Sequence, residues 1–338
     1  MFRSEDGKTI WELMEEARAE DAPPMKASKF AAAAYFWIVT STTPFIFIAY
    51  VIPTEFRNDS EEKRYWMKIL TIWLALQCMA NWLCCRFTAT HLIGTKDKAV
   101  VNKSLWKDDE NGGDYTKDPN YCKICKLIAP YGSKTHHCVV CNKCIMRRDH
   151  HCFLLGTCVG YYNQRFFAVL TFYMGISSAM CFYYFRRYLM NEIESRDDFY
   201  WTEYILPLTL KHLLIRRISL LEFTLVSYCY TFVMMGFMGC GFFTMQMHIT
   251  FYGQTWHEFN SGKKVRAYRT VFENFREVFG PYCLANFVMP MQLVFRQQEI
   301  EQPLMLLNED EKVNEPSANE EVNDNANSHV SINIENLV

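Results

Sequence analysis

The sequence predicts a mostly α-helical integral membrane protein with four transmembrane helices and a cysteine-rich, metal-binding segment between the second and the third. Three observations lead to this fold class. Half of the 338 residues are hydrophobic, and they gather in four long blocks. Lysine and arginine are concentrated between the second and third blocks. The same segment holds a dense cluster of cysteine and histidine, a composition typical of metal sites.

The four apolar blocks cover residues 30–51, 66–85, 166–185 and 223–247. Each is close to the ~20 residues that a helix needs to cross a ~30 Å hydrocarbon core. Buried core helices of a soluble protein are the alternative, but four blocks this long and apolar are unusual in one soluble domain. The remaining segments are expected to be an N-terminal segment (1–29), the cysteine-rich domain (86–165), a C-terminal motif region (248–298) and a tail (299–338).

The distribution of positive charge predicts the topology. Residues 96–165 contain twelve lysine and arginine residues, against three in the connection between blocks one and two. The positive-inside rule therefore places the cysteine-rich segment in the cytoplasm, and with four spans both termini lie there too. The basic residues of the third connection, among them Arg216 and Arg217, count mildly against this topology. Residues 1–29 have no apolar core, so no cleavable signal peptide is expected.

Cytoplasmic placement favours metal sites or catalysis over disulfides, because disulfides rarely persist in a reducing compartment. Seven cysteines and four histidines lie between Cys122 and Cys158. Cys122 with Cys125, and Cys138 with Cys141, have the Cys-x2-Cys spacing that supplies half of a tetrahedral zinc site. Two closed sites use eight of these eleven groups and leave three for other work. Outside the cluster, cysteines such as Cys84 either pack as small hydrophobic side chains or accept an acyl group.

The cluster ends in the tetrad Asp149, His150, His151 and Cys152. In an extended segment side chains alternate, so His150 and Cys152 point one way and His151 the other. This predicts that His151 binds zinc while His150 activates an unligated Cys152 as a nucleophile. Asp149 is placed to fix the tautomer of His150. The alternative is that Cys152 is a ninth ligand or an inert buried thiol.

These motifs resemble the DHHC-type protein S-acyltransferases, which are zinc-dependent palmitoyltransferases. The resemblance covers the four spans, the cysteine-rich segment and the region after the last span, where Asn274 and Gly280 match family motifs, as Gly160 and Asn163 do before the third span. It implies that one zinc ion is held by Cys122, Cys125, His137 and Cys144. It implies that the other is held by Cys138, Cys141, His151 and Cys158.

The resemblance also implies a function, with two structural zinc ions and palmitoyl-CoA as acyl donor. Cys152 would accept the acyl group and pass it to cysteines of membrane-associated client proteins, with His150 and Asp149 as the other catalytic residues. No nucleic acid is expected as a partner. The resemblance also implies localisation to an endomembrane, that of the Golgi or the endoplasmic reticulum. Candidates for contacts with the CoA phosphates are Lys134, His136, Arg147 and Arg148. Their alternative role is topology and solvation.

Two departures from the family pattern leave an alternative function open, although neither touches Asp149, His150 or Cys152, and catalysis stays the favoured hypothesis. After the tetrad, residues 153–157 read Phe-Leu-Leu-Gly-Thr where the family usually has Pro-Trp-Val-Asn-Asn. Trp256 stands where the family usually has a threonine whose hydroxyl supports the catalytic aspartate. A catalytically weak or inactive relative that acts as a membrane zinc scaffold or adaptor is therefore the second hypothesis.

Two further segments allow expectations. The third block contains the small residues Gly175, Ser177, Ser178 and Ala179, which would either open a cavity for an acyl chain or let helices approach closely. Residues 269–280 have apolar side chains at helical spacing, which is typical of an amphipathic helix. The tail from residue 299 is acidic and polar, and we expect it to be disordered.

Overall fold

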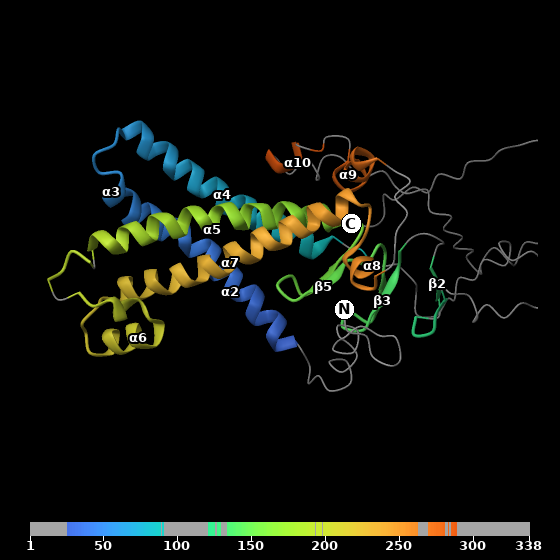
Figure 1. Cartoon of the computed structure of the whole chain (residues 1–338), viewed down its shortest axis with the longest axis horizontal. Helices are drawn as coiled ribbons and strands as arrows, with labels where there is room; N and C mark the ends of the chain where they lie inside the picture. The colour runs from blue at the N-terminus through green and yellow to red at the C-terminus, as the bar shows by residue number, and fades with distance from the viewer. Residues whose placement is uncertain are drawn as a thin grey trace, which may run out of the picture.

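The computed structural model describes residues 26–88, 90, 121–125, 127–129, 134–192, 194–197, 199–262, 270–280, 283 and 285–288. Long helices form an elongated bundle, and short β-hairpins lie at one end of it (Figure 1). Four helices are long and apolar enough to cross a membrane. The cysteine-rich hairpins lie between the second and third of them in the chain. The predicted fold class is therefore confirmed.

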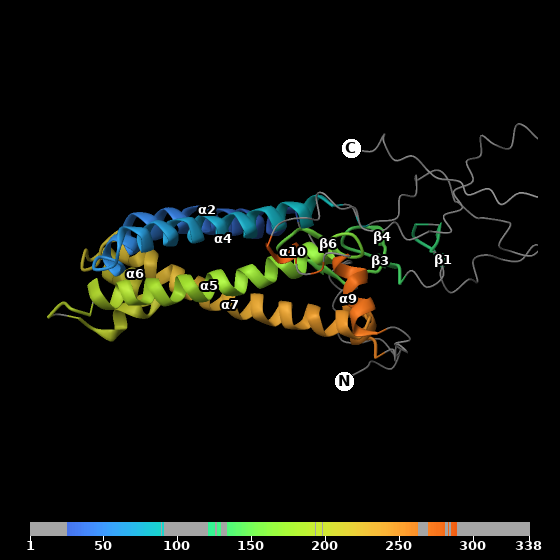
Figure 2. The same ribbon diagram turned by 90° about the horizontal axis from the view of Figure 1, so that it is seen from above.

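The first two spans pack side by side as one layer of the bundle (Figure 2). The first joins α2 (Lys26–Ile46), the π-helical turn η1 (Phe47–Val51) and α3 (Ile52–Glu55). The π-helical turn comes directly before Pro53, whose missing N–H interrupts the hydrogen-bond ladder. The second is α4 (Glu61–Phe87), which begins where Ser60 accepts a hydrogen bond from the N–H of Lys63.

The third and fourth spans, α5 (Gln164–Glu192) and α7 (Leu220–Phe251), pack against each other along most of their length (Figure 1). Their closest approach involves two glycines. A Cβ atom on Gly239 would lie 2.7 Å from the backbone nitrogen of Gly175 and 2.9 Å from the carbonyl oxygen of Thr171. Backbone atoms cannot move aside as a flexible side chain can, so the crossing requires glycine at residue 239.

The connection between α5 and α7 forms a folded cap built around a buried carboxylate. It contains η4 (Trp201–Tyr204) and α6 (Leu206–Leu214). The Glu203 side chain is 1% exposed and forms ion pairs with Arg196 at 2.6 Å and Arg217 at 2.8 Å. Two of the arginines in this connection are thus compensated internally, which reduces the positive charge that it presents at this end of the bundle.

Three antiparallel hairpins make up the described part of the cysteine-rich segment. They pair β1 (Tyr121–Cys122) with β2 (Leu127–Ile128), β3 (His136–Cys138) with β4 (Lys143–Ile145), and β5 (His150–Cys152) with β6 (Thr157–Val159). Asn163 ties the last hairpin to the bundle. Its side chain donates to the carbonyl oxygens of Cys158 and Cys85, each at 3.0 Å, so it joins β6 to α4 immediately before α5 begins.

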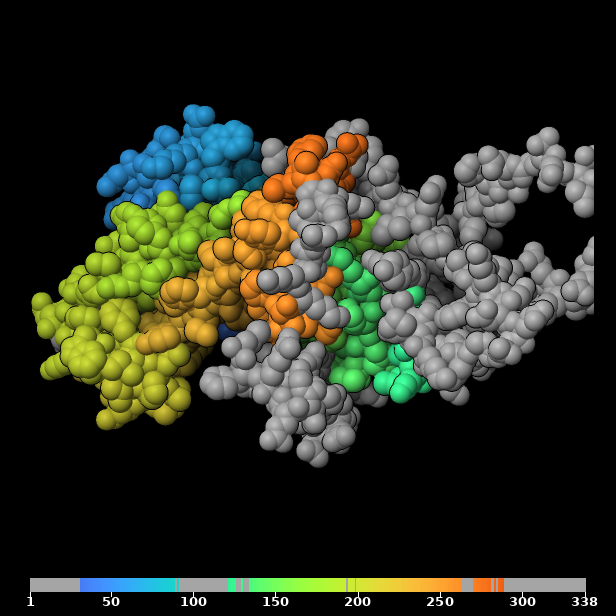
Figure 3. Space-filling view, turned by 45° about the vertical axis from the view of Figure 1, so that its right-hand side comes forward, coloured from blue at the N-terminus to red at the C-terminus, as the bar shows by residue number. Residues whose placement is uncertain are grey.

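After α7 the chain returns to the hairpins through three short helices, α8 (Trp256–Asn260), α9 (Val271–Phe279) and α10 (Ala285–Val288). The orange surface of this segment lies directly against the green surface of the hairpins (Figure 3). Asn274 donates to the carbonyl oxygen of Phe251 at 3.0 Å and so fixes α9 to the end of α7. The expected amphipathic helix thus spans residues 271–279. The expected disordered tail and most of the expected N-terminal segment lie outside the described residues.

Replacement of Gly239 by alanine is expected to destabilise the bundle. The added methyl group would meet the backbone of α5, and overpacking of this kind typically costs about 1–3 kcal/mol. The measurement is thermal unfolding of the purified protein in detergent, where the midpoint should fall by several degrees. Gly241→Ala is the matched control, because a Cβ atom there meets nothing within 4 Å. Equal midpoints for the two variants would contradict the close-approach argument.

Candidate functional site

The first candidate zinc group joins the first two hairpins. Cys122 and Cys125 come from the turn between β1 and β2, and His137 and Cys144 come from the second hairpin, where they are directly opposite each other. The Nδ1 atom of His137 lies 3.2 Å from Sγ of Cys125, 3.7 Å from Sγ of Cys122 and 4.0 Å from Sγ of Cys144. One turn and one cross-strand pair therefore supply four converging donor atoms.

The second group repeats this arrangement one hairpin further along the chain. Cys138 and Cys141 come from the turn of the second hairpin, while His151 and Cys158 are opposite each other in the third. The Nδ1 atom of His151 lies 3.2 Å from Sγ of Cys141 and 3.6 Å from Sγ of Cys158. Each hairpin is therefore linked to the next by one group of four donors.

Both groups fit zinc. Within each group all four donor atoms lie within 4.8 Å of one another. Zinc at ~2.3 Å from sulfur and ~2.0 Å from nitrogen would place tetrahedral donors about 3.5–3.8 Å apart, close to the distances found. Three cysteines and one histidine are a common structural set, and four protein donors close the coordination sphere. Bound zinc would hold the hairpins together without an open position for substrate.

Cys152 belongs to neither group. It shares β5 with His150 and His151, and the alternation of side chains puts it on the face of His150. The His150 ring packs edge-on to Phe167 at 5.0 Å and parallel to Phe242 at 6.2 Å between ring centroids. Its Nδ1 lies 2.9 Å from Oδ2 of Asp149, so Nε2 is the atom that can exchange a proton with Cys152. The structure therefore places Asp149, His150 and Cys152 close together.

Asp149 is buried and receives three hydrogen bonds from three different parts of the chain. In addition to His150, the backbone N–H of Trp256 donates to Oδ1 at 2.5 Å. The side-chain amide of Gln246 on α7 donates to Oδ2 at 2.6 Å. Asp149 thus receives a backbone donor from residue 256, although Trp256 lacks the hydroxyl of the usual threonine.

Opposing effects set the ionisation of this pair. Burial alone would raise the pKa of Asp149, but hydrogen bonds from His150, Trp256 and Gln246 lower it below the usual value. Burial alone would lower the pKa of His150, but its hydrogen bond to Asp149 and the nearby charges of Asp149 and Cys152 raise it to about 10. His150 therefore carries a proton at neutral pH, and a protonated imidazole stabilises a neighbouring thiolate.

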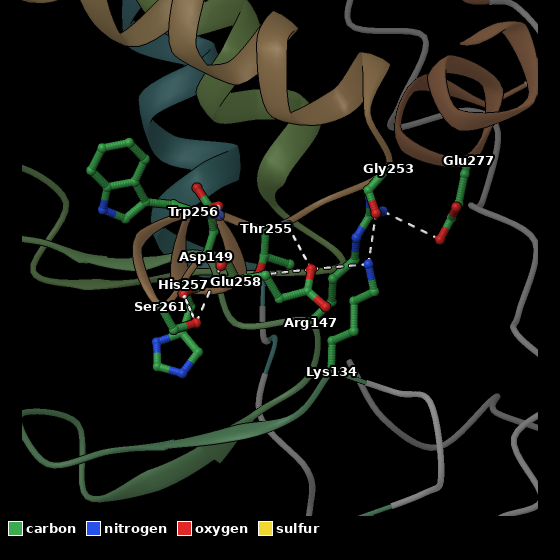
Figure 4. A network of polar contacts seen from close by, with 10 residues as sticks. All are labelled: Lys134, Arg147, Asp149, Gly253, Thr255, Trp256, His257, Glu258, Ser261 and Glu277. Carbon is green, nitrogen blue, oxygen red and sulfur yellow. Dashed lines mark hydrogen bonds and ion pairs between the residues drawn. The ribbon is translucent and has the colours of Figure 1, made fainter. Parts of the chain in front are cut away.

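Ion pairs hold the segment after α7 against the hairpins (Figure 4). Lys134 contacts Oε2 of Glu258 at 3.0 Å and the carbonyl oxygen of Gly253 at 2.6 Å. Glu258 also accepts from the N–H of Thr255, which caps α8. Arg147 pairs with Glu277 of α9 at 3.4 Å. These contacts flank Trp256 and so hold its N–H against Asp149.

The same contacts bear on the expectation for CoA, which stays a prediction. Lys134 and Arg147 were expected to bind its phosphates, but both are paired with protein carboxylates, and the Arg147 side chain is only 5% exposed. A phosphate would have to displace those carboxylates. Arg148 lines the cavity beside Cys152, and the ring of His136 lies 4.1 Å from that of His257, which also lines it. The expectation for these two residues stays a prediction.

A cavity of about 310 Å³ lies beside Cys152 and extends between α5 and α7. The wall near the hairpins contains His150, Trp256 and Gln246. The part between the helices is mainly apolar, and its lining includes Phe167, Leu170, Thr171, Met174, Met238, Phe242 and Met245. His150 and Cys152 therefore line one end of a mainly apolar chamber.

The small residues of α5 were expected either to let helices approach closely or to line a cavity, and the structure shows examples of both. Gly175 lies at the close crossing with α7, which supports helix approach. Ser177 and Ser178 line a second cavity of about 70 Å³. Met174 lines both cavities. The apolar chamber beside Cys152 is thus formed mainly by large flexible and aromatic side chains.

Sequence reasoning missed Gln246 and Gln164. Both glutamines lie inside expected spans or at their edges, where an apolar pattern conceals single polar residues. The only signal was polarity itself, because an uncharged polar side chain in a span usually faces a neighbouring helix or a cavity. Their roles become visible only when α5 and α7 are placed against Asp149.

The fold and the site together define a class of protein. Four membrane-capable helices carry a module with two zinc-type groups, and this module presents a cysteine, a histidine and a buried aspartate at the mouth of an apolar cavity. Residues 115–263 match the family model described as DHHC palmitoyltransferase. This part of the chain is therefore similar to the DHHC palmitoyltransferase family.

Curated proteins agree with this assignment. The chain is 32% identical over 160 residues to palmitoyltransferase ZDHHC22 of Danio rerio, a match that covers 47% of this chain and 58% of the relative. It is 28% identical over 214 residues to probable protein S-acyltransferase 1 of Arabidopsis thaliana, covering 61% and 54%. It is 46% identical over 57 residues to palmitoyltransferase ZDHHC7 of Mus musculus, covering 17% and 18%. The chain thus spans little more than half the length of the first two relatives.

Metal analysis of the purified protein should find two zinc ions per chain, one for each group. Cys144→Ala and Cys158→Ala each remove one of four donors and should lower the content to about one ion or less. Cys283→Ala is the control, because Cys283 is in neither group, and it should keep the full content. Zinc content that stays at the wild-type value in both ligand variants would contradict the assignment.

Proposed function

We propose that this protein is a protein S-acyltransferase that moves a long-chain fatty acyl group, palmitoyl in particular, from acyl-CoA to cysteine thiols of client proteins. Cys152 would carry the acyl group as a thioester between the two half-reactions. The single observation that supports this most is an unligated Cys152 beside a histidine held by a buried aspartate. Zinc scaffolding alone would need no such pair.

In the first half-reaction the Cys152 thiolate attacks the carbonyl carbon of the acyl-CoA thioester. A new bond forms between Sγ and this carbon, and the bond from the carbon to the CoA sulfur breaks. The departing CoA thiolate takes the proton held by His150. Asp149 keeps the imidazole in the tautomer and orientation that this transfer needs, with Nδ1 toward the carboxylate.

The second half-reaction reverses the roles of the two thiols. His150, now neutral, takes the proton of a client cysteine, whose sulfur attacks the carbonyl carbon of the acyl-enzyme. The bond to Sγ of Cys152 breaks, and the thiolate of Cys152 returns beside a protonated His150. The two zinc ions would supply no electrons and no open site. They would hold β5 in the extended geometry that separates His151 from the reactive face.

The apolar cavity supports a long acyl chain as substrate. Transfer of such a chain into water costs ~0.8 kcal/mol per CH₂ group, so a chamber between α5 and α7 next to the nucleophile offers the chain an apolar environment during the reaction. The mouth of the cavity faces the hairpins, where CoA and the client can approach from water. We propose Arg148 and His136 as contacts for the CoA phosphates.

The charge pattern supports a cytoplasmic site with both termini on the same side of an endomembrane, Golgi or endoplasmic reticulum. The lysine and arginine residues between the second and third spans favour a cytoplasmic position for the hairpins. At the opposite end Glu203 neutralises part of the arginine charge. Acyl-CoA and reduced client thiols are both available in the cytoplasm, which agrees with this orientation.

The central test is acyl-enzyme formation. Purified protein incubated with labelled palmitoyl-CoA should acquire label that hydroxylamine removes, because hydroxylamine cleaves thioesters. Cys152→Ser should abolish this label, and the matched control Cys240→Ser should keep it. Unlabelled wild-type protein would refute the enzyme hypothesis and leave a scaffold or adaptor. Label that persists in Cys152→Ser would refute the role of Cys152.

A second test concerns the depth of the acyl chamber. Met174 lines both cavities, so Met174→Ala should join them and raise the preference for stearoyl-CoA over palmitoyl-CoA in competition. Met234→Ala is the control, since Met234 is 62% exposed on α7. Truncation of a buried methionine costs about 2–5 kcal/mol, so unfolding is measured in parallel. An unchanged preference in folded Met174→Ala protein would contradict the role of this chamber.

A further inference from the structure

Two buried glutamines form a chain of amides behind the reactive pair. Gln246 on α7 is 2% exposed, and its Nε2 donates to Oδ2 of Asp149 at 2.6 Å. Gln164, the first residue of α5, is 1% exposed, and its Nε2 donates to Oε1 of Gln246 at 3.0 Å. The chain runs from the start of one span, through the other, to the carboxylate that orients His150.

Gln246 acts on the same oxygen as His150. Oδ2 of Asp149 accepts from the Nδ1 of His150 at 2.9 Å and from Gln246, while Oδ1 accepts from the N–H of Trp256. Two donors on one oxygen and a third on the other fix the carboxylate in position and in rotation. If the donor of Gln246 were lost, the carboxylate could turn about its own axis, and the direction of the His150 ring would turn with it.

Gln164 determines which end of the Gln246 amide faces Asp149. A glutamine amide has an acceptor oxygen on one side and two N–H donors on the other, and the two orientations occupy nearly the same volume. In the reversed orientation Oε1 would face an ionised carboxylate, which is repulsive in a buried site. Because Gln164 donates to Oε1, it favours the orientation that presents a donor to Asp149.

The position of Gln164 is itself fixed by the hairpin that carries the tetrad. Its backbone N–H donates to the carbonyl oxygen of Gly160 at 2.9 Å, and its neighbour Asn163 donates to the carbonyl oxygen of Cys158. α7 is held to α5 at the crossing of Gly175 and Gly239. The amide chain therefore closes a loop of contacts from β6 through both helices and back to Asp149.

We propose that Gln246 and Gln164 are positioning residues for acyl transfer, with Gln246 holding Asp149 and Gln164 orienting Gln246. This inference rests on the proposed acyltransferase function. The competing explanation is that two polar side chains merely join α5 to α7 inside the membrane, as buried polar groups in spans often do. The two explanations differ in what happens when both glutamines are replaced.

The experiment measures acyl-enzyme formation from palmitoyl-CoA with Gln246→Met, Gln164→Met and the double variant, since methionine keeps the shape but lacks the amide. Loss of one hydrogen bond to a charged group should lower kcat of Gln246→Met about ten- to a hundredfold, with little change in KM. Gln164→Met should lower kcat by a smaller factor. The double variant should be no slower than Gln246→Met alone, because Gln164 would act only through Gln246.

Gln77→Met is the matched control. Gln77 is 7% exposed in α4 and donates to the carbonyl oxygen of Val288 at 3.2 Å, away from Asp149. It should keep kcat within about twofold. Zinc content and the unfolding midpoint are measured for every variant. A double variant slower by the product of the two single factors would overturn the inference, as would a kcat loss that follows the unfolding midpoint across all variants, Gln77→Met included.

Failure of this inference is distinguishable from failure of the proposed function. If wild-type protein takes up hydroxylamine-sensitive label and Gln246→Met does so at the same rate, only the positioning role is overturned. If wild-type protein takes up no label, the acyltransferase proposal itself fails, and the positioning role fails with it. If the wild type is labelled and the double variant matches Gln246→Met at a reduced rate, both proposals are supported.

Discussion

The arrangement of the active-site end depends on one buried carboxylate. Asp149 is 2% exposed, and a buried charge is stable only when hydrogen bonds replace its lost hydration. Its donors come from the tetrad, from α7 and from the start of α8. Three parts of the chain must therefore meet before this charge is satisfied. The ion pairs of Lys134 and Arg147 keep one of those parts in contact, so helices that touch no substrate still contribute to the geometry of Cys152.

The interleaved donor groups would stabilise hairpins that are too short to fold on their own. Two or three residues per strand bury too little apolar surface to fold independently. Each group takes a turn from one hairpin and a cross-strand pair from the next, so two metal ions would order all three hairpins in sequence. Because His151 is drawn to the metal side of β5, the alternation of the strand directs His150 and Cys152 to the other side.

Much of the fold could be predicted from local patterns in the sequence. Four apolar blocks of sufficient length predicted the spans, and the period of a strand predicted which histidine faces Cys152. The ends of the helices were less predictable, since the capping residues Ser60 and Ser219 start them in polar sequence beyond the apolar pattern. The hydrogen bond from the backbone of Trp256 to Asp149 was not predictable, because every residue except proline has a backbone N–H.

The position of the glutamines explains how a reactive pair can operate at a membrane surface. Charges at this depth would normally attract water or lose their ionisation. Neutral amides instead supply oriented dipoles, which stabilise the carboxylate without adding a second net charge close to the apolar chamber. A lysine in place of Gln246 would compensate Asp149 more strongly, but it would also weaken the attraction of that carboxylate for a protonated His150. An amide holds the carboxylate in place and leaves its charge available to the histidine, which is the combination that the proposed activation of Cys152 as a nucleophile requires.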